Sequence, residues 1–382
     1  MKKVAIVNRT NLKNFGSVLQ CFALSKAVDS LGYEADLVWE RGTILRNYDF
    51  RPAKMIRTGT KLITHPYLMK DIMKSVRELR GKTISQQKVK LFDEFVEHNI
   101  RRKLFTHAEL TAAVRNNVYD AYICGSDQVW CSTTTYVDPL MYLRFAPHGK
   151  RIAYAPSIGR DFIPPYNERI MRRYILDIPH VSIREKTGQR LIKSLTGRDV
   201  PVVLDPTLLL SQENWRTAEK AVHLPSQPFL LCYFLNAPHV DTVRAINALM
   251  TERGLKSVLV GDGFSGENVS LTGERPDCGP GEFLYCVDRA DAVITDSYHG
   301  MLFSILFEKE FWSIEREYQQ FDQSSRQLSI LETLGLSDRY RKRGERLVGE
   351  QIDYHLVLAA LDAEREKSVA YLRDALVDVE GT

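Results

Sequence analysis

Short runs of aliphatic and β-branched residues alternate with stretches of helical periodicity along this chain, and this alternation constrains its fold most strongly. The short runs predict buried strands, because each is four to seven residues long and ends at polar or turn residues. Helices are predicted between them, for example over 18–24, 240–252 and 298–307. Strands that alternate with helices favour parallel α/β sheets. The predicted strands are 4–7, 33–39, 121–124, 152–155, 181–183, 201–206, 229–235, 257–260, 292–295 and 311–314.

The alternation occurs in both halves of the chain. A length of 382 residues also suits two domains of ordinary size. We therefore predict an α/β protein with two Rossmann-like domains facing a cleft, one over 1–190 and the other over 191–350. The last segment, 351–382, is predicted to be mostly one long helix that packs back on the N-terminal domain.

Composition excludes several other classes of protein. The net charge is only +4, whereas nucleic-acid-binding proteins are usually more basic, so we expect no nucleic-acid partner. There is no run of ~18 apolar residues to span a bilayer and no signal peptide at the N-terminus, which favours a cytoplasmic protein. The six cysteines include no CxxC pair, and we expect neither disulfides nor a metal site.

Residues 41–103 differ from the rest of the chain, because they hold sixteen Lys and Arg against six Asp and Glu. Apolar residues such as Ile56, Ile63 and Tyr67 are interleaved with the basic ones. The pattern predicts one or two basic amphipathic helices inserted in the N-terminal domain. They either form a solvated pair covering the sheet or bind the inner face of the membrane through anionic lipids.

Two segments with polar residues follow predicted strands of the first half. Asn14, Gly16 and Ser17 begin a helix, whose free N–H groups suit an anion, although Asn14 or Ser17 could simply cap it. The segment Ser126-Asp127-Gln128 follows the 121–124 strand at an end where α/β sheets place ligands. Its polar side chains suit sugar hydroxyls, and the alternative is an ordinary turn. The chain has neither a GxGxxG nor a P-loop motif.

Two further segments offer charged or titratable side chains. Arg184 follows the 181–183 strand, where a guanidinium can bind phosphate or carboxylate with two hydrogen bonds, or simply pair with Glu185 at the surface. His299 lies in the first turn of the 298–307 helix, beside Ser297 and Gly300, and suits proton transfer. Asp205 and Arg326 are lesser candidates, since Asp205 could only stabilise a turn and Arg326 could only decorate a helix.

In these segments the chain resembles the polysaccharide pyruvyl transferase family. The resemblance covers nearly the whole chain, in the same order, and includes the final helix. The matching stretches are Asn14-Phe15-Gly16-Ser17-Val18-Leu19-Gln20, Gly125-Ser126-Asp127-Gln128-Val129-Trp130, Tyr154-Ala155-Pro156-Ser157-Ile158-Gly159, Ser182-Ile183-Arg184-Glu185-Lys186, Val203-Leu204-Asp205-Pro206-Thr207-Leu208-Leu209-Leu210 and Thr295-Asp296-Ser297-Tyr298-His299-Gly300.

The resemblance implies a fold of the GT-B type and transfer of pyruvate from phosphoenolpyruvate to two hydroxyls of a sugar, with release of phosphate. It implies that Arg184 and His299 hold the donor and do the proton chemistry. We expect Asp127 to assist as a third catalytic residue. The residues expected to bind the donor are Ser297, Tyr298, Gly300, Lys186 and Arg326, and those expected to bind the acceptor are Asn14, Gly16, Ser17, Ser126 and Gln128.

The chain departs from the family pattern at two positions. Some members carry an arginine where this chain has Ser297, so another cation must help to hold the donor, with Arg326, Arg316 and Lys186 as candidates. Others carry an aspartate at the position of Ser17, which puts the identity of the acceptor in doubt. The expected acceptor is a saccharide of a cell-surface polysaccharide, free or lipid-linked. We expect no cofactor and no metal, and a homo-oligomer is left open.

Two other functions are compatible with these residues. A glycosyltransferase of the same fold would use a nucleotide sugar, bound near Gly261-Asp262-Gly263 and Glu282. A non-catalytic glycan-binding protein would bind sugar without releasing phosphate. Binding of phosphoenolpyruvate in preference to UDP-, GDP- and CMP-sugars would distinguish the pyruvyl transferase from the glycosyltransferase, and phosphate release would distinguish it from the glycan-binding protein.

Overall fold

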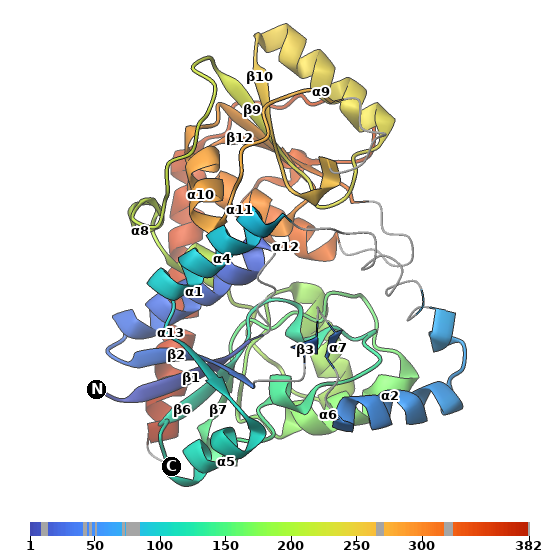
Figure 1. Cartoon of the computed structure of the whole chain (residues 1–382), viewed down its shortest axis with the longest axis vertical. Coiled ribbons are helices and arrows are strands. Elements are labelled where there is room, and N and C mark those ends of the chain that lie inside the picture. Colours follow the sequence, from blue (N-terminus) through green and yellow to red (C-terminus); the bar gives the residue numbers. More distant parts are fainter. Residues whose placement is uncertain are drawn as a thin grey trace.

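Two parallel sheets form the framework of the computed structural model (Figure 1). The structure describes residues 1–8, 14–40, 44–45, 48–49, 52–70, 73, 85–264, 271–316 and 324–380. The predicted α/β class with two Rossmann-like sheets and a long C-terminal helix is confirmed. Among the helices in these ranges, none combines the length and apolar character needed to cross a bilayer.

The N-terminal sheet has the strand order β5-β2-β1-β6-β7-β8, and all of its pairs are parallel. Taken in chain order this is 3-2-1-4-5-6, the arrangement of Rossmann domains. The order reverses between β1 and β6, so a crevice for ligands is expected beyond their carboxyl ends. The strands are β1 (Lys3–Val7), β2 (Glu34–Glu40), β5 (Arg102–Phe105), β6 (Ala121–Cys124), β7 (Arg151–Ala153) and β8 (His180–Val181).

The C-terminal sheet has the order β10-β9-β11-β12-β13, again with parallel pairs. In chain order this is 2-1-3-4-5, the other common doubly wound order, whose reversal lies between β9 and β11. The strands are β9 (Phe229–Tyr233), β10 (Lys256–Val260), β11 (Ala292–Thr295), β12 (Glu310–Ile314) and β13 (Tyr340–Arg341).

Helices cover both sheets and join them. The helices that follow N-terminal strands are α1 (Phe15–Ser30), α2 (Pro52–Thr64), α4 (Gln86–Asn99), α5 (His107–Arg115), α6 (Pro165–Leu176) and α7 (Lys186–Thr196). The later ones are α8 (Gln212–Arg216), α9 (Val240–Arg253), α10 (Pro280–Arg289), α11 (Tyr298–Leu306), α12 (Ser325–Thr333) and α13 (Tyr354–Glu380). The proposed domain boundary at residue 190 falls within α7. The division of the chain into two domains at this position stays a prediction.

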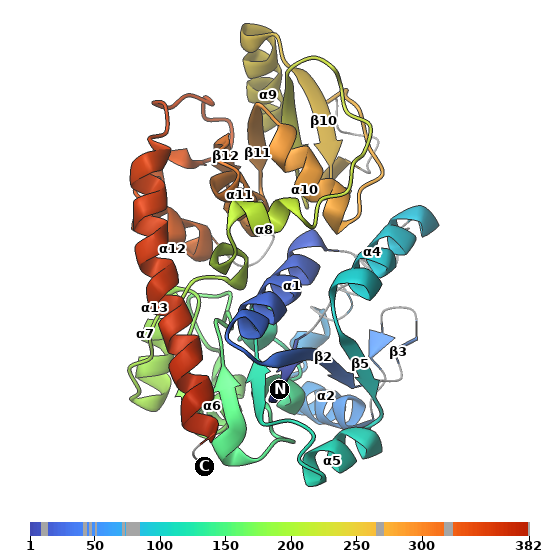
Figure 2. The same ribbon diagram turned by 90° about the vertical axis from the view of Figure 1, so that its left-hand side faces the viewer.

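The helix α13 runs beside both sheets (Figure 2). Near its start, the Tyr354 hydroxyl donates to the carbonyl oxygen of Lys309, just before β12. Further along, the Tyr371 hydroxyl donates to the carbonyl oxygen of Ala153 in β7 over 3.2 Å. The helix is therefore anchored to both sheets.

The interface between the sheets is aromatic. In this interface α1 contacts α10 and α11, and α4 contacts α10 (Figures 1 and 2). Phe15, the first residue of α1, stacks on Phe283 of α10 with 4.7 Å between ring centroids and on Phe92 of α4 with 5.2 Å. All three side chains are buried. This packing fixes the start of α1 against the C-terminal half of the molecule.

Two predictions about elements were wrong. Residues 201–206 do not form a strand: Val202 makes a single bridge to Ile183, and the turn of 3-10 helix at Pro206–Leu209 follows. The β-branched run was misleading because this segment crosses between the sheets. The basic segment 41–103 holds the helices α2 and α4 as predicted, but its end joins the N-terminal sheet as β5. Its members Arg41, Arg46, Arg51, Lys74, Arg77, Arg80 and Lys82 lie outside the described residues.

Candidate active site

Four side chains from separate segments form one cluster, which we call the Arg184 cluster: Arg184, Asp127, Asp205 and His299. Arg184 Nη1 donates to Asp205 Oδ2 over 2.5 Å, and Arg184 Nη2 donates to Asp127 Oδ1 over 3.3 Å. His299 Nε2 lies 3.5 Å from the same Asp205 oxygen. Asp205 thus joins an arginine that follows the N-terminal sheet to a histidine that follows the C-terminal sheet.

The topology explains why these side chains meet. Asp127 follows β6 and His299 follows β11, so each lies beside the point where its sheet reverses strand order. Arg184 follows β8 after Ser182 and the bridge residue Ile183, and its backbone N–H donates to the Pro156 carbonyl over 3.2 Å. Ligand sites of doubly wound sheets lie at these carboxyl ends. The two reversal points therefore face each other at the Arg184 cluster.

Local backbone features place the histidine. Ser297 caps α11, since its hydroxyl oxygen accepts from the Gly300 backbone N–H over 3.3 Å, and His299 follows in the first turn. Gly16 of α1 lies directly against the imidazole: a Cβ on Gly16 would be 2.0 Å from His299 Nδ1. Only a glycine at this position allows α1 to approach His299 so closely. The two halves of the molecule thus meet at the histidine ring.

Burial and charge determine the protonation of the two carboxylates. Burial disfavours a charged Asp205, but His299 and Arg184 hold the pKa of its carboxyl well below the ordinary value. Burial likewise opposes a charged Asp127, whose pKa Arg184, His299 and Arg326 lower. Both residues are therefore carboxylates at neutral pH. Their side chains differ in access, since that of Asp127 is 28% exposed and that of Asp205 is 0% exposed.

Tyr298 and Arg326 complete the surroundings of Arg184. The guanidinium carbon of Arg184 lies 4.5 Å from the centroid of the Tyr298 ring, and that of Arg326 lies 5.5 Å from it. Such contacts are attractive because the ring face is electronegative. Arg184 itself is buried, and its Nε has no hydrogen-bond partner among the described residues. One donor of the guanidinium is thus left over for another group.

The structure keeps some predicted donor-site residues away from the cluster. Lys186 Nζ lies 2.9 Å from Glu332 at the surface, and Arg316 Nε lies 3.2 Å from Asp296. Gly300 is packed against Thr295 and Tyr233 rather than against an open space. Of the three cations suggested to compensate for Ser297, Arg326 is the one that the structure brings to the cluster.

The predicted acceptor-site residues are placed around the cluster with different exposures. Ser126 is buried, and its hydroxyl donates to the Ala155 carbonyl over 2.9 Å and lies 3.4 Å from Asp205. Asn14 caps α1 by accepting from the Ser17 backbone N–H over 3.2 Å, and Ser17 is buried. Gln128 is half-buried and lies against Gly159. Of the five predicted acceptor-site residues, Asn14 and Gln128 are the most exposed to solvent, and Gly16, Ser17 and Ser126 are buried.

Sequence reasoning ranked Asp205 too low. One of its oxygens does stabilise a turn, as expected, by accepting from the Thr207 N–H over 3.0 Å and the Thr207 hydroxyl over 2.8 Å. The other oxygen joins Arg184 to His299. The suggested Arg184–Glu185 surface pair was wrong: both side chains are buried, and Glu185 instead accepts hydrogen bonds from Ser157, Ile158 and Gly159.

Comparison with known proteins gives one family. The family model described as "Polysaccharide pyruvyl transferase" matches residues 14–318, which include the whole Arg184 cluster. Among curated protein sequences, none matches this chain significantly.

Solved structures resemble the chain over nearly its full length at low identity. A putative UDP-N-acetylglucosamine 2-epimerase from Listeria monocytogenes has 12% identity and a TM-score of 0.49, covering 98% of this chain and 91% of that one. MurG of Acinetobacter baumannii has 8% identity and a TM-score of 0.43, covering 100% and 95%. The ADP-heptose LPS heptosyltransferase II of E. coli has 13% identity and a TM-score of 0.40, covering 96% and 99%.

Proposed function

We propose, since this chain belongs to the polysaccharide pyruvyl transferase family, that it transfers pyruvate from phosphoenolpyruvate to two hydroxyls of a sugar and releases phosphate. The observation that carries the proposal is the meeting of Arg184 and His299 at Asp205. A guanidinium suits the charged groups of the donor, and an imidazole suits the proton transfers that ketal formation requires. The two come from different sheets, so a donor bound between them would contact both halves of the protein.

Arg184 is already neutralised by two carboxylates, so donor binding needs an exchange of partners. The contact with Asp127 is the weaker one, at 3.3 Å against 2.5 Å for Asp205, and Asp127 is the more exposed carboxylate. We assign Asp127 as the group that a phosphate or carboxylate of the donor displaces from Arg184. The exchange leaves Asp127 as a free carboxylate beside the bound donor, where it can accept a proton from a sugar hydroxyl.

The remaining chemistry balances with one proton donor and one proton acceptor. His299, in its protonated form, gives a proton to the methylene carbon of the donor, which becomes the methyl group. The first sugar hydroxyl attacks C2 and loses its proton to Asp127. The bond between C2 and the phosphate oxygen then breaks, and the second hydroxyl attacks C2 and loses its proton. Of the two hydroxyl protons, one returns to His299 and the other leaves with the phosphate, so that His299 and Asp127 end in their starting forms. Arg184 and Arg326 offset the charge on the departing phosphate.

Asp205 has a positioning role in this scheme. It is fully buried and holds Arg184 and His299 through one oxygen, so it does not reach a substrate. Its charge also provides a partner for the protonated imidazole. The acceptor lies on the opposite side, toward Asp127 and Gln128, and we propose that it is a saccharide of a cell-surface polysaccharide or its precursor.

The test is an assay of the purified protein with phosphoenolpyruvate and a set of galactosides, mannosides and glucuronides. We expect phosphate release, together with a product that has gained pyruvate and lost two exchangeable hydroxyl protons. Parallel reactions with UDP-, GDP- and CMP-sugars test for glycosyl transfer. Turnover of a nucleotide sugar with no use of phosphoenolpyruvate would overturn the proposal, as would sugar binding with no release of phosphate from any acceptor.

A further inference from the structure

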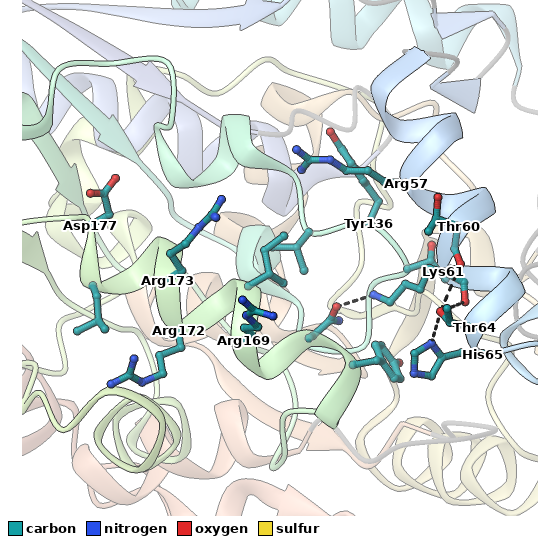
Figure 3. Close-up of a pocket in the computed structure, with 16 residues that line it drawn as sticks. Arg57, Thr60, Lys61, Thr64, His65, Tyr136, Arg169, Arg172, Arg173 and Asp177 are labelled. Atoms are coloured by element: carbon teal, nitrogen blue, oxygen red, sulfur yellow. Dashed lines mark hydrogen bonds between the residues drawn. The ribbon is translucent and has the colours of Figure 1, made fainter.

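A second site lies between α2 and α6, apart from the Arg184 cluster. This α2–α6 pocket encloses about 880 Å³, a volume in the range of ligand sites. Figure 3 shows Arg57, Lys61 and His65 on the α2 side of the space and Arg169 and Arg173 on α6. Its walls come from segments about a hundred residues apart in the sequence.

The charge of the α2–α6 pocket is strongly one-sided. The acid in its lining, Asp177, is already paired with Arg144 and Arg151, outside the pocket. Within the described ranges, no carboxylate forms an ion pair with the basic residues of the lining. These residues are Arg57, Lys61, Arg169, Arg172 and Arg173. Such a cluster repels itself unless an anion from outside binds there.

Lys61 is the innermost of these cations. It is half-buried, and its Nζ donates to Asn167 Oδ1 over 2.5 Å and lies 4.4 Å from the centroid of the Tyr166 ring. Burial lowers the pKa of Lys61 to about 8. The ammonium group therefore loses hydration without gaining a carboxylate, and a bound anion would offset that loss.

An exposed apolar stripe runs along α2 and the following turn, next to the cations. Ile56 and Ile63 are seven residues apart in α2, so they lie on one side of the helix, and Tyr67 follows in the turn after it. Their exposed fractions are 68%, 83% and 58%. Arg57 and Lys61 lie on the adjacent side, facing the pocket (Figure 3). A basic face beside an exposed apolar face is typical of helices that lie in a membrane interface.

We propose that the α2–α6 pocket binds the phosphate-bearing head group of a membrane lipid while the apolar stripe of Ile56, Ile63 and Tyr67 enters the bilayer interface. Charge complementarity selects this occupant, because the charged lining side chains that lack an ion-pair partner among the described residues are cations, and the adjoining stripe is apolar. The inference goes beyond the proposed function and does not depend on it. It assigns a surface through which the protein is held at a membrane.

The position of the pocket would bring membrane and active site close together. Thr135 lines the pocket, and Asp127 of the Arg184 cluster is eight positions earlier in the chain. Even fully extended, that segment spans at most about 29 Å. An acceptor held at the membrane surface by its own lipid would therefore lie near the Arg184 cluster.

The experiment is co-sedimentation of the full chain, without donor or acceptor, with two kinds of vesicle. One contains phosphatidylcholine alone, and the other contains phosphatidylcholine with phosphatidic acid. We expect binding to the second only. The double variant Arg57→Glu/Arg169→Glu should weaken this binding by about 20-fold or more, and Ile63→Ser should weaken it by about tenfold. Melting curves check that each variant is folded.

A matched control separates this site from general attraction of a basic protein to an anionic surface. Arg244→Glu/Lys256→Glu changes the net charge by the same amount at exposed positions of the C-terminal half, and we expect less than a twofold effect. Equal losses in both double variants would overturn the proposal, as would absence of vesicle binding by the wild type.

Two further arms identify the source of the phosphate. Binding that inorganic phosphate abolishes at millimolar concentration, with no effect of Ile63→Ser, would show a free-phosphate site and overturn the lipid assignment. Pyruvyl transfer to a water-soluble sugar should be unchanged in Arg57→Glu/Arg169→Glu. Failure of vesicle binding therefore leaves the proposed function standing, and failure of transfer leaves the lipid site standing.

Discussion

The Arg184 cluster and the α2–α6 pocket differ in how their charged side chains are paired. In the cluster, a fully buried arginine is matched by two carboxylates, and a histidine lies beside one of them. In the pocket, five cations line an open space whose single acid is paired elsewhere. A buried charge must be paired within the fold, because leaving it alone in a poorly polarisable interior is very costly. The pocket cations are exposed or, in the case of Lys61, half-buried, so water solvates them and they need no partner within the fold.

This difference in pairing determines what each region must do to bind a ligand. The Arg184 cluster is preorganised, so a donor must displace an internal partner before it binds. The α2–α6 pocket needs no such exchange, since its cations have no internal carboxylate partners in the described part of the chain. Changes in the cluster should therefore alter both folding and chemistry, whereas changes in the pocket should alter binding alone.

The largest effect is expected at His299. His299→Gln keeps a side chain with polar atoms but removes the group that transfers protons, so kcat for pyruvyl transfer should fall by about 10²–10⁴-fold. The measurement is phosphate release under saturating donor. His355→Gln, an exposed change on α13, is the control and should keep wild-type turnover. A His299→Gln enzyme with near-normal turnover would remove the histidine from the chemistry.

Asp205→Asn tests whether the cluster is paired as described. Removal of one partner from a buried ion pair typically lowers the free energy of unfolding by about 3–5 kcal/mol, measurable by urea titration at pH 7. The surface change Asp199→Asn breaks a pair with Lys193 and should cost less than about 1 kcal/mol. Equal costs for the two variants would contradict the difference between buried and exposed pairs.

The same variant predicts a pH dependence of stability. The pKa of Asp205 is lowered in the folded protein, so its charge stabilises the fold above its ordinary pKa of about 3.9. That stabilisation is lost as the pH falls through the lower folded-state pKa. The difference in unfolding free energy between wild type and Asp205→Asn should therefore shrink below pH ~4. A difference that stays constant down to pH ~3 would indicate a cost unrelated to the carboxylate charge.

Asp127→Asn and Arg184→Lys separate the two partners of the proposed exchange. Asp127→Asn removes a competitor for Arg184 and a proton acceptor, so kcat should fall about 10²-fold, while KM for phosphoenolpyruvate stays equal or falls. Arg184→Lys removes charged hydrogen bonds to the donor, and KM should rise about 10–150-fold. Steady-state kinetics distinguishes the two. A raised donor KM in Asp127→Asn would contradict the exchange.

The smallest effects are expected from replacing two glycines by alanine: Gly16, which lies against His299 of the Arg184 cluster, and Gly59 in α2, beside the α2–α6 pocket. Gly16→Ala places a methyl group where the His299 ring lies, so it should cost about 1–3 kcal/mol of stability and reduce turnover. Gly59 of α2 has no atom within 4 Å of the position that an added methyl group would occupy, and Gly59→Ala should stabilise the helix by up to about 1 kcal/mol. Thermal unfolding measures both. Similar shifts in the two variants would show that α1 is not packed on His299 as described.

Much of the fold could be predicted from local patterns. The strand at Ala121–Cys124 and the helix start at Tyr298 agree with the structure to the residue, because a buried strand and a capped helix leave clear signals in sequence. The edge strand β5 was missed because it begins with the charged residues Arg102 and Lys103, and because the side chains of Lys103 and Leu104 are exposed. Its identity as a strand depends on pairing with β2, more than sixty residues earlier.

The site could be predicted only in part, for the same reason. Arg184 and His299 were found from their positions at strand ends, but nothing local to Asp205 indicates that it joins them. Asp205 and His299, far apart in sequence, meet because the 3-10 turn at Pro206–Leu209 contacts both α1 and α11. The α2–α6 pocket was likewise hidden, because only Arg57 and Lys61 of its basic residues lie in 41–103, and nothing in the sequence placed α6 opposite them.

The most direct test of the central claim is a double-variant cycle on kcat/KM for phosphoenolpyruvate, with Arg184→Lys, His299→Gln and both together. If the two side chains act on one donor and share Asp205, the double variant should lose much less than the product of the two single losses. Losses that multiply fully would show that Arg184 and His299 act independently, and would contradict a single transfer site formed by both sheets.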